Sequence, residues 1–259
     1  MSNADTAPTP EGSKQAEADT RALAVTNWPD LTAAAYERIE ELFVSMALAP
    51  GSKLRTQDLQ VKLGLGRTPV HQAVRRLAAG TLLQIQPRNG LRVPTIDLSR
   101  ERRLVSVRRD LNRFVTEAAV GNLSANHRAT LSFLKRRLIG ERDRLTLDGF
   151  NEIDKALDIL LLHASGEPFL ESALRPLHAM ARRIGYLHIS QIGGRAGLER
   201  TINKHLDIIE SVLHGDKAQA CRTSDQLVDF GMSMIDELEE TIDPALLDAE
   251  GSFRPTFGI

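Results

Sequence analysis

The fold is decided by the stretch Gly64–Pro94, which reads GLGRTPVHQAVRRLAAGTLLQIQPRNGLRVP. Thr68-Pro69 is typical of a helix start, because a hydroxyl can cap free N–H groups and proline suits the first helical turn. An apolar stripe at helical spacing follows: Val70, Ala73, Val74 and Leu77. The opposite face carries long or polar side chains: His71, Gln72, Arg75 and Arg76. The sequence therefore predicts an amphipathic helix with a basic outer face.

A β-hairpin is predicted directly after this helix. Asn89-Gly90 favours a turn, and the short apolar runs Leu82–Ile85 and Leu91–Val93 flank it. Two further helices are predicted upstream, one over Tyr36–Met46 and a short one that contains Leu59 and Leu63 and stops at Gly64. Three helices followed by a hairpin describe a winged helix-turn-helix.

Beyond residue 98 the strand signals vanish. Helical periodicity between glycine-containing joints predicts further helices at about 100–120, 124–139, 148–164, 169–190, 197–214 and 217–240. Short joints favour an antiparallel helical bundle. We therefore expect a mostly α protein, with a disordered arm at 1–32, a winged helix-turn-helix at 33–98, a helical domain at 99–243 and a tail at 244–259.

Composition limits the function classes. Cys221 is the only cysteine of the 259 residues, so we expect neither a disulfide framework nor a thiolate zinc site. No apolar run reaches the roughly 20 residues that a membrane span requires, and the chain is expected to be cytoplasmic. It has no Gly-x-Ser-x-Gly elbow or Walker loop, and Gly64-Leu65-Gly66 lacks the third glycine of a dinucleotide site. An enzyme is therefore not expected.

Charge is unevenly distributed along the chain. The net charge is −1, but residues 33–98 carry nine Lys or Arg against five Asp or Glu, whereas residues 1–32 carry two against five. A basic excess confined to the winged helix-turn-helix indicates that this domain alone binds a polyanion. Duplex DNA is the expected partner, and an adaptor that uses the same corner to bind protein is the alternative.

The start of the predicted recognition helix supplies the candidate base contacts. Arg67, Thr68, His71 and Gln72 lie there, where side chains of such helices reach base edges in the major groove. We expect Arg67 to contact a guanine, because its planar fork matches the O6 and N7 acceptors.

Other residues are candidates for contacts outside the major-groove base edges. Gln57 at the second helix and either Arg75 or Arg76 are expected to contact phosphates. Arg88 at the hairpin tip is expected to enter the minor groove, with Gly90 allowing close approach.

The residues PGSKLRTQDLQVKLGLGRTPVHQAVRRL (50–77) and QPRNGLRV (86–93) resemble the N-terminal domain of GntR-type bacterial transcription regulators. The resemblance covers residues 33–96 and includes the Arg-Thr-Pro-Val motif and the Pro-Arg-x-Gly wing. Three positions depart from the family pattern: Gly66 replaces Ser, Gln57 replaces Arg, and His71 replaces Arg. These three substitutions keep the DNA-docking surface, but they put in doubt whether this chain binds the operator sequence usual for the family.

The helical part resembles the ligand-binding half of the FadR-like branch of this family. That resemblance implies a divalent metal ion held by one Asp and three His, beneath an organic-acid effector. Here Asp154 matches the Asp, Asp158 the first His and His205 the second, while the third falls near Leu227, which cannot be a ligand. Loss of the metal site is therefore expected, and the alternative is that two carboxylates and one imidazole still hold Mg²⁺ or Mn²⁺ rather than Zn²⁺. Alternative ligands in a shifted register are His178, His188, Asp225 and Gln226.

The resemblance also places Arg108 in the effector pocket, where a guanidinium would pair with a carboxylate. Arg182 and Arg183 are further candidates of this kind. It implies a ligand-responsive transcription regulator, a repressor, that binds a short palindromic operator as a homodimer.

Overall fold

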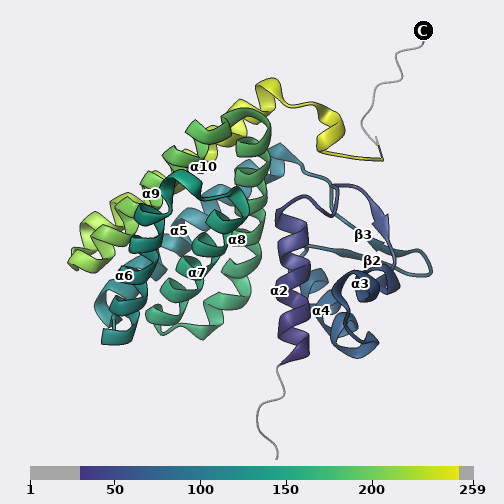
Figure 1. Ribbon diagram of the computed structural model, residues 1–259, viewed down its shortest axis with the longest axis horizontal. Helices are drawn as coiled ribbons and strands as arrows, with labels where there is room; N and C mark the ends of the chain where they lie inside the picture. The colour runs from purple at the N-terminus through teal and green to yellow at the C-terminus, as the bar shows by residue number, and fades with distance from the viewer. Residues whose placement is uncertain (1–29, 251–259) are drawn as a thin grey trace, which may run out of the picture.

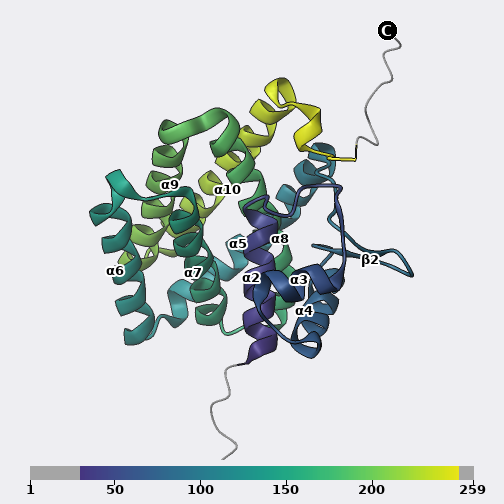
Figure 2. The ribbon, with the colours of Figure 1, turned by 45° about the vertical axis from the view of Figure 1, so that its right-hand side comes forward.

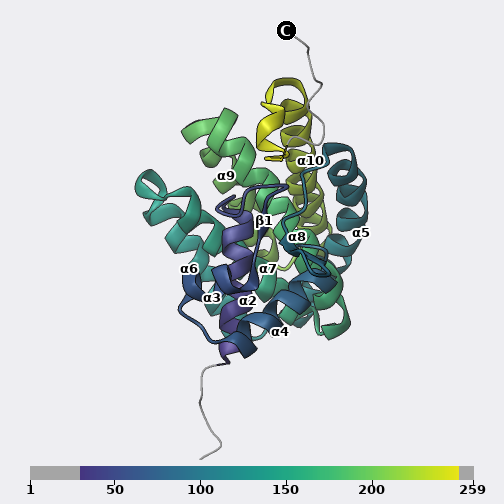
Figure 3. The same ribbon diagram turned by 90° about the vertical axis from the view of Figure 1, so that its right-hand side faces the viewer.

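The computed structural model describes residues 30–250 (Figure 1). Nearly all of the predicted disordered arm and the last nine residues of the predicted tail lie outside this range. The described chain forms a small domain with three helices and a sheet, next to a larger helical bundle. Helix α2 (Leu31–Val44) belongs to the small domain and packs on its other helices and on the bundle; Figure 1 shows it between the two, and Figure 2 and Figure 3 show it from two further sides. None of the described helices is both long and apolar enough to cross a membrane.

The small domain is the predicted winged helix-turn-helix. Its elements after α2 are β1 (Lys53–Leu54), α3 (Thr56–Leu63), α4 (Arg67–Ala79), β2 (Gln84–Gln86) and β3 (Gly90–Arg92). Helix α2 begins at Leu31, two residues inside the expected arm, because Asp30 caps the N–H groups of Thr32 and Ala33. The predicted stripe of α4 is buried in full: Val70, Ala73, Val74 and Leu77.

The expected cap of α4 was wrong. Its N-cap is Gly66, which has no side chain to offer, and Thr68 lies inside the first turn. The glycine at the other side of the turn behaves as expected, because Gly64 adopts a left-handed conformation with φ +64° and ends α3.

The hairpin is present and belongs to a sheet of three strands. All pairings are antiparallel in the order β1-β3-β2, with Lys53 opposite Arg92 and Gln86 opposite Gly90. Strand β1 was not expected, because Lys53-Leu54 is too short to show a pattern. Leu82-Leu83 precedes β2 instead of forming it, and both leucines are buried in the domain core.

The predicted bundle helices are all present, with shifts of a few residues at their ends. They are α5 (Leu98–Asn122), α6 (Ala125–Gly140), α7 (Leu147–Ser165), α8 (Pro168–His188), α9 (Gly194–His214) and α10 (Lys217–Thr241). A single π-helical turn, Ile189–Gly193, joins α8 to α9. The bundle core is formed mainly by leucine and isoleucine, and its fully buried members include Leu131, Leu138, Ile153, Leu174 and Ile202.

The chain beyond α10 returns to the small domain. The amide of Ala249 donates to the carbonyl of Pro50 at 2.8 Å, and the amide of Ile96 donates to the carbonyl of Leu247 at 3.0 Å. Glu250 then forms an ion pair with Lys53 at 3.1 Å. Residues 244–250 therefore form a strap from the bundle to the base of the sheet.

Candidate functional site

The start of α4 is a solvent-facing surface. Arg67, Thr68, His71, Gln72 and Arg75 are all exposed there. Because Gly66 provides no capping side chain, the amides of the first turn remain available to an external acceptor. A helix N-terminus of this kind attracts anionic groups such as phosphates.

Two polar residues of α4 are held by α2. The hydroxyl of Thr32 donates to Oε1 of Gln72 at 2.7 Å. The guanidinium of Arg76 lies 4.9 Å from the ring centroid of Tyr36. Both arginines considered for phosphate contact, Arg75 and Arg76, are exposed, and Arg76 in addition stacks on Tyr36. Gln57 is exposed at the start of α3.

The wing tip is shaped by two left-handed residues. Arg88 is exposed with φ +66°, and Gly90 has φ +85°. A Cβ at Gly90 would lie 2.8 Å from the carbonyl oxygen of Leu54. The glycine is therefore required by the packing of β3 against β1, a role that the sequence did not reveal.

A cavity of about 90 Å³ lies inside the bundle, and the first-choice effector and metal candidates, Arg108, Asp154, Asp158 and His205, line it. Its polar lining also includes Asn112, Asn151, His178, Arg182 and Thr201, and its apolar lining includes Phe150, Leu227 and Met234. Leu227 lies where the family resemblance places the third histidine ligand. The cavity therefore combines several charged groups in a confined space.

Arg108 enters this cavity without an ion-pair partner among the described residues. Its Nε is buried and makes no hydrogen bond. Burial lowers the pKa of Arg108, although Asp158 and Asp154 oppose this shift by their charge. An arginine in such a setting retains its charge and stabilises an incoming anion.

Asp154 and His205 form a closed pair. Nδ1 of His205 lies 2.8 Å from the carbonyl of Thr201, to which it donates, and Nε2 lies 2.9 Å from Oδ1 of Asp154. Both ring nitrogens therefore carry protons. Burial opposes this cation, but the charge of Asp154 outweighs burial and raises the pKa of His205. The same contact lowers the pKa of Asp154 against its own burial.

Asp158 points to a different partner. Its Oδ2 lies 2.6 Å from Nη1 of Arg182 and 3.3 Å from Nδ1 of His178. Burial, followed by the negative charge of Asp154, raises the pKa of Asp158. His178 is held by Asn112 at 2.8 Å, and burial together with the charge of Arg182 lowers its pKa to about 3, so the ring is neutral.

The donor set as arranged does not fit a divalent metal ion. Nε2 of His205 is protonated by its contact with Asp154, and Arg182 occupies the carboxylate of Asp158. Across residues 30–250, no three His, Cys, Asp or Glu side chains converge in a way that could hold a metal. A guanidinium therefore supplies positive charge in the part of the cavity where the family resemblance places a metal ion.

The alternative ligands do not complete the set. His178 lines the cavity, but His188 binds Glu237 at 2.7 Å and Asp225 binds Arg113 at 3.1 Å, and Gln226 is exposed. Arg183 lies outside the cavity and packs 4.1 Å from the ring centroid of Phe43 in the small domain.

Two domain models cover most of the described chain. Residues 31–93 match the model described as "Bacterial regulatory proteins, gntR family", and residues 103–230 match the FCD domain. The chain belongs to the GntR family. This GntR protein carries the all-helical C-terminal domain of the FadR-like branch.

Named relatives agree with this assignment. The HTH-type transcriptional regulator McbR of Escherichia coli (strain K12) is 25% identical over 177 residues, which cover 68% of this chain and 79% of McbR. The HTH-type transcriptional repressor RspR of the same strain is 24% identical over 183 residues, covering 70% of this chain and 78% of RspR.

Solved structures share the fold. The structure of E. coli McbR/YncC has a TM-score of 0.71 at 20% identity and covers 82% of this chain and 99% of that one. The crystal structure of a putative transcriptional regulator GntR from Rhodococcus sp. RHA1 has a TM-score of 0.59 at 14% identity, and the match covers 80% of this chain and 97% of that one. The GntR protein is thus a DNA-binding transcription regulator and not an enzyme, which favours duplex DNA over the adaptor alternative.

Proposed function

We propose that this GntR protein is a ligand-responsive repressor controlled by a small carboxylate in the bundle cavity. The observation that carries the proposal is Arg108, a half-buried arginine that lines the cavity and whose buried Nε has no hydrogen-bond partner. A carboxylate is the natural acceptor for such a group, because two parallel hydrogen bonds and opposite charge stabilise the pair. The volume of about 90 Å³ favours a small acid.

The effector, in this proposal, binds without a resident metal ion. The charges of Arg182 and His205 already neutralise Asp158 and Asp154, so a divalent cation would have to displace two paired groups. Retention of an Mg²⁺ or Mn²⁺ ion is the competing prediction, and a chelator distinguishes the two.

On the DNA side, we propose that α4 enters the major groove and the wing contacts the adjacent minor groove. The exposed start of α4 supports this role, with Arg67 and Thr68 beside uncapped amides. A homodimer on a palindromic operator, inside the cytoplasm, completes the proposal.

The test begins with the full-length protein and duplex from its own upstream intergenic region, against random duplex of equal length. Binding is measured by fluorescence anisotropy while small carboxylates are added one at a time. We expect the protein to bind the upstream duplex selectively and to be released from it by one of the acids. EDTA should change neither the binding nor the release. Selective binding that no acid alters would contradict the effector proposal, and equal binding to both duplexes would contradict sequence readout.

A further inference from the structure

Glu40 of α2 is a buried carboxylate at the junction between the two domains. It is 1% exposed, and its oxygens meet cations of the bundle: Arg182 at 3.1 Å, Arg175 at 3.3 Å and Lys155 at 3.6 Å. Buried charges persist only when they are paired. Each cation also has a second carboxylate partner, Asp158 for Arg182 and Glu37 for both Arg175 and Lys155, but Glu40 contacts all three. The bundle thus contains a built anion site that the small domain fills with its own carboxylate.

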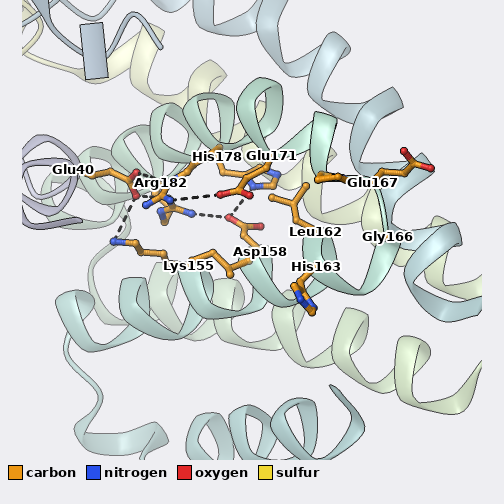
Figure 4. Close-up of a pocket in the computed structure, with 13 residues that line it drawn as sticks. Glu40, Lys155, Asp158, Leu162, His163, Gly166, Glu167, Glu171, His178 and Arg182 are labelled. Carbon is orange, nitrogen blue, oxygen red and sulfur yellow. Dashed lines mark hydrogen bonds and ion pairs between the residues drawn. The ribbon is translucent and has the colours of Figure 1, made fainter. Parts of the chain in front are cut away.

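A cavity of about 320 Å³ opens next to this site (Figure 4). Its lining includes all three cations, while Ile159, Leu162 and Pro168 provide an apolar wall. Small-molecule sites are typically roughly 300 to 1,000 Å³ and mainly apolar, with a few convergent polar groups. A molecule in this cavity would reach the cations that hold Glu40.

The junction is coupled to the recognition helix. Arg175 lies 4.3 Å from the ring centroid of Tyr36, and Arg76 of α4 packs on the same ring. A Cβ at Gly80, the C-cap of α4, would lie 2.9 Å from the ring of Pro176, so α4 also contacts α8 directly. Movement of α2 away from the bundle would therefore change the position of α4.

We propose that the junction cavity is a second binding site and that it takes an amphipathic carboxylate. The charged group of this ligand competes with Glu40 for Arg175, Lys155 and Arg182, and its apolar part lies on the wall that contains Ile159. A carboxylate is the matching class because it replaces Glu40 with a group of the same charge. A ligand bound in the junction cavity weakens the ion pairs of Glu40 with the bundle, and with them the contact between the bundle and the DNA-binding domain.

This site goes beyond the proposed effector site. The two cavities share the side chains of Asp158, His178 and Arg182, but Arg108 lines only the inner one. Binding at the junction can therefore be measured without DNA and without Arg108. Its failure would leave the proposed repressor function standing.

The experiment titrates the full-length protein with hexanoate and with hexanamide in a calorimeter. We expect wild-type protein to bind hexanoate weakly, and Glu40→Gln to bind it at least about tenfold more tightly, because the internal competitor is gone. Hexanamide should bind neither protein. Equal affinity in both proteins, equal binding of the amide, or no binding to either would overturn the proposal.

Three variants make the result specific. Glu41→Gln is the matched control, because Glu41 lies on the same helix 3.5 Å from Lys155 but is exposed, and it should keep wild-type affinity. Ile159→Trp fills the apolar end at a position that is 46% exposed and should abolish hexanoate binding in a folded protein. Arg108→Met should leave it unchanged. If Glu40→Gln fails to fold, the Ile159→Trp variant tests the proposal by itself. Hexanoate binding to Ile159→Trp with wild-type affinity would then overturn the proposed site.

Discussion

Arg182 joins Glu40 of the DNA-binding domain to Asp158 of the inner cavity. Its Nη2 lies 3.1 Å from Glu40 and its Nη1 lies 2.6 Å from Asp158, and the guanidinium is buried between them (Figure 4). A single side chain therefore contacts both the inner cavity and α2. Any ligand that changes the partner of Arg182 on one side alters the charge balance on the other.

Removal of this guanidinium should be destabilising. Arg182→Met takes one cation from the half-buried Asp158 and from the buried Glu40, which keeps Arg175 and Lys155, and we expect the free energy of unfolding to fall by about 1–3 kcal/mol in urea titrations. The triple change with Glu40→Gln and Asp158→Asn should cost less than the sum of the single changes, because the three side chains act as one unit. Arg200→Met, an exposed arginine of α9, should stay within about 0.5 kcal/mol of wild type. A loss of stability in the triple variant equal to the sum of the three single losses would contradict the coupling of Glu40, Arg182 and Asp158.

Arg108→Met should abolish the response to the effector without lowering the stability of the fold. Because Arg108 is half-buried, with a buried Nε and no ion-pair partner among the described residues, methionine removes a partly desolvated charge, and we expect the melting temperature to stay level or rise. Release from operator DNA by the carboxylate effector should be lost. A variant that melts much earlier would show that Arg108 stabilises the fold rather than binding the effector.

Arg67→Ala should weaken operator binding by about 1–3 kcal/mol and relax the preference for guanine at its contact position. Anisotropy titrations on operator variants at fixed salt measure both effects. Arg103→Ala, an exposed arginine of α5 in the bundle, is the matched control and should bind like wild type. Similar losses in both variants would mean that Arg67 contributes only general charge.

Two glycines with left-handed backbones allow a paired test of the wing. Gly90→Ala adds a Cβ 2.8 Å from the Leu54 carbonyl, whereas the nearest atoms to a Cβ at Gly64 lie beyond 4 Å. We expect Gly64→Ala to cost about 1 kcal/mol from backbone strain alone and Gly90→Ala to cost more, by roughly another 1–3 kcal/mol. Equal losses in thermal unfolding would show that β1 does not constrain the wing.

Acid should weaken the junction through Glu37. Burial raises its pKa, but the contacts with Lys155 and Arg175 outweigh burial, and the pKa lies below the ordinary 4.5. A lowered folded pKa gives stability that is complete above the unfolded value and is lost as pH falls through the folded one. Between the ordinary pKa of about 4.5 and more acidic pH, wild type should lose more stability than Glu37→Gln. Glu117→Gln, at an exposed site of α5, should follow wild type.

The sequence predicted the winged helix-turn-helix and the bundle because both depend on local patterns. Val70, Ala73, Val74 and Leu77 form a helical stripe whatever the rest of the chain does, and they are buried as expected. The cap of α4 was misassigned because Thr68-Pro69 has a cap-like composition, while the backbone of Gly66 places the boundary two residues earlier.

The junction could not be predicted, because its parts are far apart in the sequence. Glu37, Glu40 and Glu41 look like a solvated helix face until α7 and α8 bring Lys155, Arg175 and Arg182 against them. The role of Arg182 likewise depends on two acceptors in different domains. The expected set of Asp154, Asp158 and His205 does line one cavity, but pairing with Arg182 and the protonation of His205 follow only from three-dimensional geometry.

The strap of residues 244–250 limits how the DNA-binding domain can move. That domain is fastened to the bundle at Glu40 on one side and by the backbone of Ala249 on the other. Arg175 on Tyr36, Arg183 on Phe43 and Pro176 beside Gly80 make further contacts across the same junction. Release at Glu40 alone would therefore leave the domain held by these contacts and by the strap, so the recognition helix would shift by a limited amount rather than drift freely.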